Sequence, residues 1–411
     1  MYSLCPNGPM QSIICRACMC RRPRIRASVR WVRAGGPHAG AGSSDTTERP
    51  ESPLKRLVQD ASAFGEAAPA ERELQWATQP YAAQAANAEP ADRDARVRPE
   101  ESSVLLFPGQ GSHFVGMGRR LQDIPAARDL YELASNIVGW DVSRVCREGP
   151  AAELAARGQT AVLVTALAAL ERARELRPAA LQRVRAAAGF SLGEIAALVF
   201  AAALPFDQAL RLVELRTAAM QAAAAERAGG MLTLWLAPDA RLGALLAAAR
   251  DAAAAHVAQP VCQVANYLFP GCKVIAGDEE ALRFVEAEGA AFGVRRAARV
   301  HVAGAFHTPL MARAEAAVRA ALGSVRAAAP RVRVVSCVDA RAYRDARDVA
   351  ARVARLTTAP VRWEQTLHAL FARPRDASQP LTLALGPGAT LRSTLRMVNA
   401  RAWDASVQID V

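Results

Sequence analysis

The sequence predicts an α/β protein with a parallel sheet in a large subdomain and a second, smaller subdomain inserted into it. Short apolar segments suited to buried strands alternate with helical segments from residue 103 onward, which is the order of a layered α/β fold. Between about residues 228 and 302 the order becomes β-α-β-β-α-β, as in a ferredoxin-like unit.

The elements of the large subdomain follow from local patterns. The apolar run in "SSVLLFPGQGS" predicts a buried strand that ends at Pro108. Helical periodicity covers residues 126–138, 159–176, 192–204 and 206–227, and a small-residue strand covers 186–189. After the insertion, "RVRVVSCV" and "LTLALGPG" predict two more strands, so the α/β pattern resumes.

The elements of the insertion are equally regular. Strands are expected at "GGMLTLWLAP", "VCQVANYLF", "KVIAG" and "RRAARVHVAG". Helices are expected over residues 239–254 and 278–291, and His256 and His301 are expected to lie within the adjacent helix and strand patterns.

The N-terminal region differs from the rest in charge. Residues 1–44 hold seven arginines and no acidic residue, so the net charge of +12 comes largely from this leader. Such a leader is typical of a mitochondrial transit peptide, and a nucleic-acid-binding arm is the alternative. Residues 45–102, rich in Ala, Pro, Glu and Arg, are expected to be a disordered linker, and residues 103–411 the folded domain.

Composition also bears on membrane and metal binding. No apolar run is long enough to predict a transmembrane segment. The pair Cys15 and Cys18 has no second ligand pair at metal spacing, so we expect no metal site. The remaining cysteines outside the leader are expected to be reduced and buried: Cys146, Cys262, Cys272 and Cys337.

A serine between glycines is the strongest single motif. "GFSLG" (189–193) matches G-x-S-x-G between a predicted strand and a predicted helix, which is the nucleophile elbow of hydrolase-like folds. The glycines allow close packing, and a helix that begins beside Ser191 offers the N–H of Leu192 to an oxyanion. A tight turn without a catalytic role is the alternative interpretation.

A serine nucleophile needs a base, and one histidine stands out. His307 in "VAGAFHTPLM" lies in a loop between a strand and a helix, where catalytic bases are commonly presented, although a structural role is equally compatible with this position. The glycine-rich loop in "LLFPGQGSHFVGMG" lacks the Walker lysine and the dinucleotide spacing. It therefore favours a loop that offers backbone N–H groups to an oxyanion.

Taken in order, these segments resemble the malonyl-CoA:acyl carrier protein transacylases and the acyltransferase domains of fatty acid and polyketide synthases. The resemblance runs from Ser102 to the end of the chain, and with the Arg-rich leader it is closest to the mitochondrial type. It rests on "LLFPGQGS", "GFSLGEIAALVFA", "LVELRTAAMQ", "NYLFPGCKVIAG", "GAFHTPLM", "PVRWEQTLHAL" and "LALGPGATL".

The resemblance implies a role for each element of the reaction centre. Ser191 would be the nucleophile and His307 the base, oriented by a backbone carbonyl near Leu356 in place of a carboxylate. The backbone N–H groups of Gln110 and Leu192 would form the oxyanion hole. No cofactor is expected.

The resemblance also implies how the substrate is recognised. Arg216, which would by default face solvent, would bind the free malonyl carboxylate, and Phe306 before the base agrees with malonyl over methylmalonyl. Gln159 and Asn266 match further pocket positions. Two positions depart from the common family pattern: Phe190 replaces His, and His113 replaces Gln.

The sequence thus predicts transfer of malonyl from malonyl-CoA to a mitochondrial acyl carrier protein, through an ester on Ser191, by a monomer in the mitochondrial matrix that binds no nucleic acid. Two alternatives remain at this point: a serine thioesterase or esterase that uses the same elbow, and a non-catalytic mitochondrial RNA-binding factor that uses the basic leader.

Overall fold

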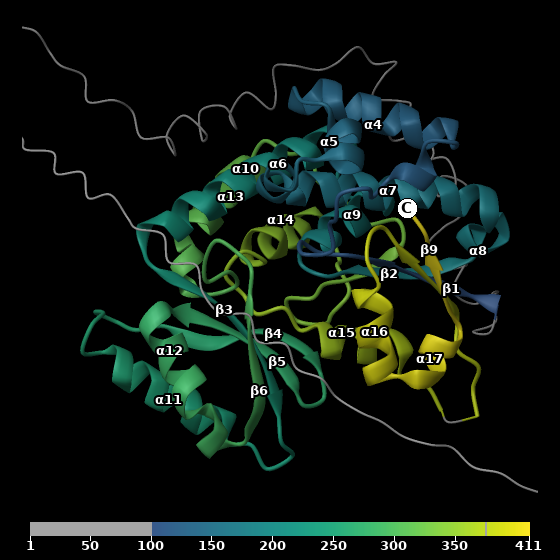
Figure 1. Ribbon diagram of the computed structural model, residues 1–411. Helices are drawn as coiled ribbons and strands as arrows, with labels where there is room; N and C mark the ends of the chain where they lie inside the picture. Colours follow the sequence, from purple (N-terminus) through teal and green to yellow (C-terminus); the bar gives the residue numbers. More distant parts are fainter. Residues whose placement is uncertain (1–100, 375) are drawn as a thin grey trace, which may run out of the picture. The chain divides into compact units, whose positions relative to one another are not determined.

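A five-stranded parallel sheet organises the larger subdomain of the computed structural model, which describes residues 101–374 and 376–411 (Figure 1). The strand order is β7-β2-β1-β8-β9 and every neighbouring pair is parallel. The strands are β1 (Ser103–Phe107), β2 (Val184–Gly189), β7 (Arg333–Val335), β8 (Leu381–Leu385) and β9 (Ser406–Ile409).

Helices cover both faces of this sheet. Successive residues of a strand point to opposite faces, so the apolar side chains of these strands need cover on both sides. Leu105 and Phe107 pack into one core cluster, and Val104 and Leu106 into the other. The first face carries α4 (Pro125–Val138), α5 (Val142–Glu148), α6 (Ala151–Ala156), α7 (Gly158–Leu176), α8 (Pro178–Gln182), α9 (Leu192–Phe200), α10 (Phe206–Glu226), α13 (Ala312–Leu322) and α14 (Ala346–Arg355). The second carries α15 (Trp363–Phe371), α16 (Thr390–Val398) and α17 (Ala400–Asp404).

The smaller subdomain is a four-stranded antiparallel sheet in the order β4-β5-β3-β6, the ferredoxin-like order predicted from the sequence. Two helices pack on this sheet through their own core cluster (Figure 1). The elements are β3 (Gly229–Leu236), α11 (Leu242–Ala253), β4 (Cys262–Phe269), β5 (Cys272–Asp278), α12 (Glu279–Glu288) and β6 (Val294–Val300). The predicted fold class is therefore confirmed for both subdomains.

Several element ends differ from the sequence prediction. Helix α9 ends at Phe200 and not at residue 204, because Ala202 has a left-handed φ of 56° that a helix does not accommodate. Helix α12 ends at Glu288, and the chain then forms a short 3-10 turn (Gly289–Phe292). His256 lies beyond the end of α11 and His301 beyond the end of β6, and strand β9 was not predicted.

Some sequence predictions lie outside the described residues: the transit peptide (1–44), nearly all of the linker (45–102), and the pair Cys15 and Cys18. Within the described ranges, no helix is long and apolar enough to span a membrane. Over the same residues, no three His, Cys, Asp or Glu side chains gather as a potential metal site. The four cysteines found there are all free and buried.

Candidate active site

Ser191 occupies a strained turn at the carboxyl end of β2, immediately before α9. Its φ of 51° lies in the left-handed region, which costs a non-glycine residue about 1–3 kcal/mol. The flanking glycines make this turn possible: a Cβ on Gly189 would lie 1.8 Å from the carbonyl carbon of Gly193, and a Cβ on Gly193 would lie 2.2 Å from the Phe107 carbonyl oxygen. The predicted strand–turn–helix elbow is therefore present, and it presents the serine at the carboxyl end of the parallel sheet.

His307 lies opposite this serine, brought there by the chain that follows β6. Its Nε2 is 3.0 Å from Ser191 Oγ, and both side chains are buried. The His307 backbone also has a left-handed φ, of 62°. Two hydrogen bonds fix this backbone: the His307 N–H donates to the Thr357 carbonyl at 3.2 Å, and the His307 carbonyl accepts from Gln263 Nε2 at 3.1 Å. This geometry is that of a serine nucleophile next to a general base.

The electrostatic environment keeps the His307 ring neutral. Burial, and then the charge of Arg216, lower the pKa of His307 to about 3. The backbone carbonyls of Leu356 and Ala359 act in the opposite direction by favouring the protonated ring, although neither forms a hydrogen bond of normal geometry with Nδ1. A neutral ring can accept the hydroxyl proton of Ser191 at physiological pH.

Arg216 contacts the same serine from α10. Its Nη2 donates to Ser191 Oγ at 3.2 Å and its Nη1 donates to Gln159 Oε1 on α7. The side chain is only 1% exposed, and its Nε has no partner among the described residues. Burial lowers the pKa of Arg216 to about 10, so the guanidinium stays charged at neutral pH. A buried cation with unused donors suits an anionic group of a substrate.

Two backbone segments lie beside Ser191 where an oxyanion could be held. Leu192 is the first residue of α9, and the first N–H groups of a helix have no partner inside it. Gln110 follows β1 in a loop packed closely against the elbow, since a Cβ on Gly109 would lie 2.5 Å from the Phe190 carbonyl oxygen. The N–H of Gln110 makes no hydrogen bond to the described part of the chain.

Asn266 and Phe306 lie in neighbouring segments, and among the described residues no hydrogen bond joins either side chain to Ser191. Asn266 is on β4, is 8% exposed, and its Oδ1 has no partner among residues 101–374 and 376–411. Phe306 directly precedes His307 and packs into the larger core cluster. Hydrogen bonds thus link Ser191, His307, Arg216 and Gln159.

Comparison with known proteins agrees with this arrangement. Residues 104–379 match the acyl transferase domain family. A probable mitochondrial malonyl-CoA-acyl carrier protein transacylase of Drosophila melanogaster is 45% identical over 78% of this chain and 86% of its own length. The mitochondrial malonyl-CoA-acyl carrier protein transacylase of Homo sapiens is 38% identical over 94% of this chain and 95% of its own length. The chain belongs to the malonyl-CoA-acyl carrier protein transacylase family.

Solved structures of malonyl transacylases share the fold. The malonyl-CoA:acyl carrier protein transacylase of Xanthomonas oryzae pv. oryzae has a TM-score of 0.68 and 30% identity, covering 76% of this chain and 96% of that one. A malonyl-transacylase in complex with its type II polyketide synthase acyl-carrier protein has a TM-score of 0.65 and 29% identity, covering 75% of this chain and 94% of that one.

Phe190, the first departure from the common transacylase pattern, forms part of an apolar wall. Its ring meets that of Trp363 edge-on, with 5.6 Å between ring centroids. The second departure, His113, is partly buried, which lowers the pKa of its ring, and its Nδ1 has no partner in the described ranges.

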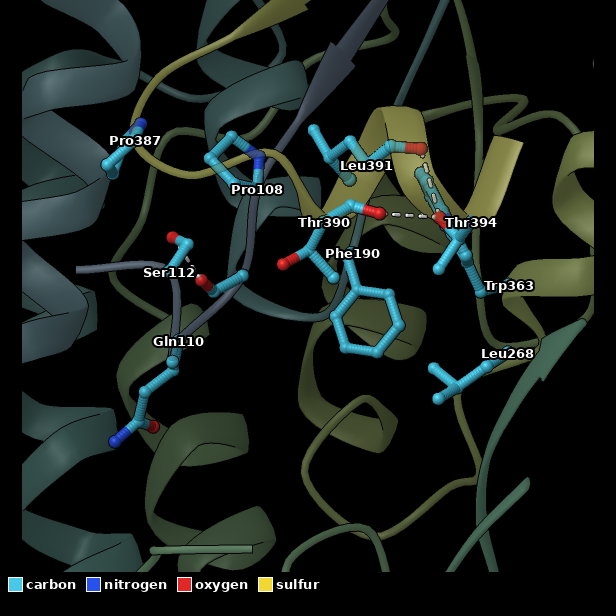
Figure 2. A pocket seen from close by; sticks show the side chains of 12 residues that line it. Pro108, Gln110, Ser112, Phe190, Leu268, Trp363, Pro387, Thr390, Leu391 and Thr394 are labelled. Carbon is cyan, nitrogen blue, oxygen red and sulfur yellow. Dashed lines mark hydrogen bonds between the residues drawn. The ribbon is translucent and has the colours of Figure 1, made fainter. Parts of the chain in front are cut away.

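An apolar cavity of about 140 Å³ adjoins the reaction centre of this transacylase family member (Figure 2). Figure 2 shows the Phe190 ring between the Gln110 loop on one side and Leu268 and Trp363 on the other. Several polar side chains of its wall form local hydrogen bonds: Thr394 accepts from Trp363 Nε1 at 3.0 Å and Ser112 donates to the Gly109 carbonyl at 2.9 Å. The cavity therefore offers mainly apolar contact, next to the candidate oxyanion loop.

Sequence reasoning missed Glu194, which lies in the first turn of α9. Its side chain is fully buried, and its carboxylate accepts hydrogen bonds from Ser336 Oγ at 2.8 Å, from the Cys337 N–H at 2.6 Å and from the Tyr343 hydroxyl. An acidic residue inside the otherwise apolar segment "SLGEIAALVF" was the available signal, since buried carboxylates are rare unless partnered.

Proposed function

We propose that this chain transfers malonyl from malonyl-CoA to the phosphopantetheine thiol of an acyl carrier protein, through an ester on Ser191. One observation carries the assignment: the serine oxygen that faces His307 Nε2 also accepts a hydrogen bond from the buried Arg216 guanidinium. Nucleophile, base and a receptor for a carboxylate therefore meet at one atom, as a malonyl thioester requires. Membership of the transacylase family supports the same activity.

In the first half-reaction, Ser191 Oγ attacks the thioester carbonyl while His307 Nε2 accepts its proton. The bond between Oγ and the carbonyl carbon forms, and the negative charge on the carbonyl oxygen is stabilised by the N–H groups of Gln110 and Leu192. When the carbon–sulfur bond breaks, the coenzyme A thiolate takes the proton back from His307. The malonyl group remains as an ester on Ser191.

The second half-reaction runs the same steps in reverse with a new thiol. His307 accepts the proton of the carrier's phosphopantetheine thiol, whose sulfur attacks the ester carbonyl. Collapse of the tetrahedral intermediate breaks the ester bond and returns the proton to Ser191 Oγ. Both half-reactions use only groups of the chain and the two thiols, so the mechanism requires no cofactor.

Arg216 selects the acyl group in this proposal. On binding, its guanidinium exchanges the hydrogen bond to Ser191 for bidentate contact with the free malonyl carboxylate, while Gln159 continues to orient it. An acetyl group would leave the same cation buried without an anion, which disfavours acetyl transfer. Asn266, whose Oδ1 has no partner in the part of the chain that the structure describes, and Phe306 complete the walls on the acyl side.

The apolar cavity beside Phe190 receives the pantetheine arm in this account. The arm consists largely of methylene, methyl and amide groups, and it must leave the reaction centre on a side not occupied by the acyl group. The wall formed by Phe190, Leu268 and Trp363 offers apolar contact at that point. A shared arm site explains how coenzyme A and carrier protein can be used in turn.

We infer that the reaction takes place in the mitochondrion, in the matrix, as the mitochondrial names of the relatives and the Arg-rich residues 1–44 both indicate. The acceptor is then the mitochondrial acyl carrier protein. We also propose that the chain acts as a monomer, since nucleophile, base and acyl receptor all lie on one copy.

The test is to mix the full chain with malonyl-CoA and acyl carrier protein and to quantify malonyl-carrier and free malonate. The proposal predicts malonyl-carrier with little malonate, no transfer by Ser191→Ala, and unchanged transfer by Ser393→Ala, which alters an exposed serine. Malonate as the main product would identify a thioesterase. Transfer that survives in Ser191→Ala would remove the serine from its proposed role.

A further inference from the structure

The ring of His307 is not held by a carboxylate. Its Nε2 faces Ser191 Oγ at 3.0 Å, and its Nδ1 has no hydrogen-bond partner among residues 101–374 and 376–411. In the serine hydrolase triad, a carboxylate bonded to the second ring nitrogen fixes the orientation of the imidazole. In this chain the position of the ring therefore depends on how the backbone of His307 is held.

That backbone adopts a conformation that needs support. The φ of His307 is 62°, and a residue other than glycine keeps such a value only where the surrounding structure imposes it. Within the turn, Thr308 Oγ1 donates to the Ala305 carbonyl at 2.7 Å. From outside the turn, the His307 N–H is bound by the Thr357 carbonyl at 3.2 Å, and the His307 carbonyl is bound by Gln263 Nε2 at 3.1 Å.

Both outside contacts depend on strand β4 of the smaller subdomain. Gln263 lies on β4 itself. The segment that follows Thr357 is joined to the same strand by two backbone hydrogen bonds of 2.8 Å: the Tyr267 N–H donates to the Val361 carbonyl, and the Val361 N–H donates to the Ala265 carbonyl. One strand thus supports the base directly through a side chain and indirectly through a neighbouring segment.

The amide of Gln263 suits this task because it is uncharged. A half-buried amide could form a hydrogen bond merely to satisfy its own donor. Here, however, the acceptor is the backbone of the base, 44 residues further along the chain. A lysine or arginine at this position would add a positive charge near the imidazole and make its protonation harder, whereas a neutral amide holds the backbone without that effect.

We propose that Gln263 is a positioning residue for the base: its side-chain amide holds the backbone of His307 so that Nε2 faces Ser191 Oγ. The inference rests on the proposed function, in which His307 moves the proton in both half-reactions. Gln263 acts through His307 and not on the substrate. Its loss should therefore slow proton transfer while leaving the selection of the acyl group by Arg216 unchanged.

The first test is the single-turnover rate at which the full chain forms the malonyl ester. Gln263→Met keeps an unbranched side chain of similar length and removes the donor. We expect the first-order rate constant at saturating malonyl-CoA to fall about tenfold, with the half-saturating concentration within about twofold of the native value. Loss of folded protein would lower the amplitude and not this rate constant. A native rate constant, or a change confined to the half-saturating concentration, would contradict the proposal.

A kinetic double-mutant cycle separates positioning of the base from general support of the pocket. In the His307→Ala background there is no ring to position, so adding Gln263→Met should change the residual rate of ester formation by less than about twofold. An equal loss in both backgrounds would show that Gln263 acts independently of His307, and the proposal would be rejected.

Gln221→Met is the matched control. It removes the same kind of bond at another place, since Gln221 Nε2 donates to the Ala156 carbonyl at 3.3 Å. Its rate constant should stay within about twofold of the native value. A loss as large as that of Gln263→Met would remove the special role of the bond to His307.

If Gln263→Met does not fold, Gln263→Glu takes its place in the same cycle at about pH 8, where the ionised carboxylate cannot donate a hydrogen bond. The same loss is expected from this variant. Failure of both variants to fold would assign Gln263 to folding and reject the proposal.

The cycle measures ester formation alone, which separates this inference from the proposed transfer. A native chain that forms the ester and releases malonate would refute the transfer to a carrier protein, but the cycle would still decide the role of Gln263. A tenfold loss confined to the background that contains His307 would support that role. Absence of the ester from the native chain would refute both.

Discussion

The two sides of Ser191 differ in the forces that they offer a substrate. On one side stand a neutral imidazole, a buried guanidinium and an amide that orients it: His307, Arg216 and Gln159. On the other side stand the apolar side chains of Phe190, Leu268 and Trp363. A malonyl thioester has the same asymmetry, a carboxylate at one end and a long pantetheine arm at the other. This difference supports the proposal that charge selects the acyl group and that apolar contact accommodates its carrier.

The largest expected effect comes from the base on the polar side. His307→Ala removes the ring nitrogen that faces Ser191 Oγ as a proton acceptor, so acyl-enzyme formation should fall about 1,000-fold. Rapid-quench measurement with malonyl-CoA checks this. His368→Ala, which alters an exposed histidine on α15, is the control and should retain the native rate. A loss of less than about tenfold in His307→Ala would assign the proton to another group.

Next in size is the loss of the cation. Arg216→Met should lower kcat/KM for malonyl-CoA about 100-fold and leave kcat/KM for acetyl-CoA equal or higher, because the carboxylate contact is lost and the unpaired buried charge disappears. Steady-state assays with both donors measure the two values. Arg211→Met on the same helix is the matched control. Equal losses for both donors would mean that Arg216 is structural.

A smaller effect is expected on the apolar side. Leu268→Trp narrows the cavity and should raise KM for malonyl-CoA and acetyl-CoA alike, by about fivefold, with the preference between them unchanged. Leu176→Trp, at a leucine that is 56% exposed, controls for the bulk of the indole. If Leu268→Trp altered the acyl preference and not the shared KM, the cavity would belong to the acyl group.

The smallest effect is the response to pH. Because the pKa of His307 is lowered to about 3, the base stays neutral, and the single-turnover rate should vary by less than about twofold between pH 5 and 8. A decline with a midpoint near 6.5 would contradict the lowered pKa. The same shift should reduce the free energy of unfolding as pH falls below 6.5, since the unfolded chain then binds a proton that the folded chain does not.

How much of this site the sequence could reveal depended on the kind of signal. Ser191 lies in a G-x-S-x-G motif, which predicts one particular turn of the backbone. His307 was assigned as its base from the position of His307 in a loop, together with the family resemblance. The buried carboxylate of Glu194 was not predicted. Its partners Ser336, Cys337 and Tyr343 lie more than 140 residues further along the chain, and only the fold brings them together. The apolar wall was missed for the same reason, since Phe190 and Trp363 lie on different elements. The short strand β9 lacks a strong period and, among the described strands, pairs with β8 alone.

The central claim, that the charged side of Ser191 selects the acyl group, is tested most directly by competition. The full chain and Arg216→Met are each mixed briefly with equal concentrations of malonyl-CoA and acetyl-CoA, and the adducts are identified by intact-protein mass spectrometry, with peptide mapping to the site. The account predicts a malonyl ester on Ser191 in the native chain and predominantly an acetyl ester on the same serine in Arg216→Met. The same mixture of adducts on both proteins would contradict it.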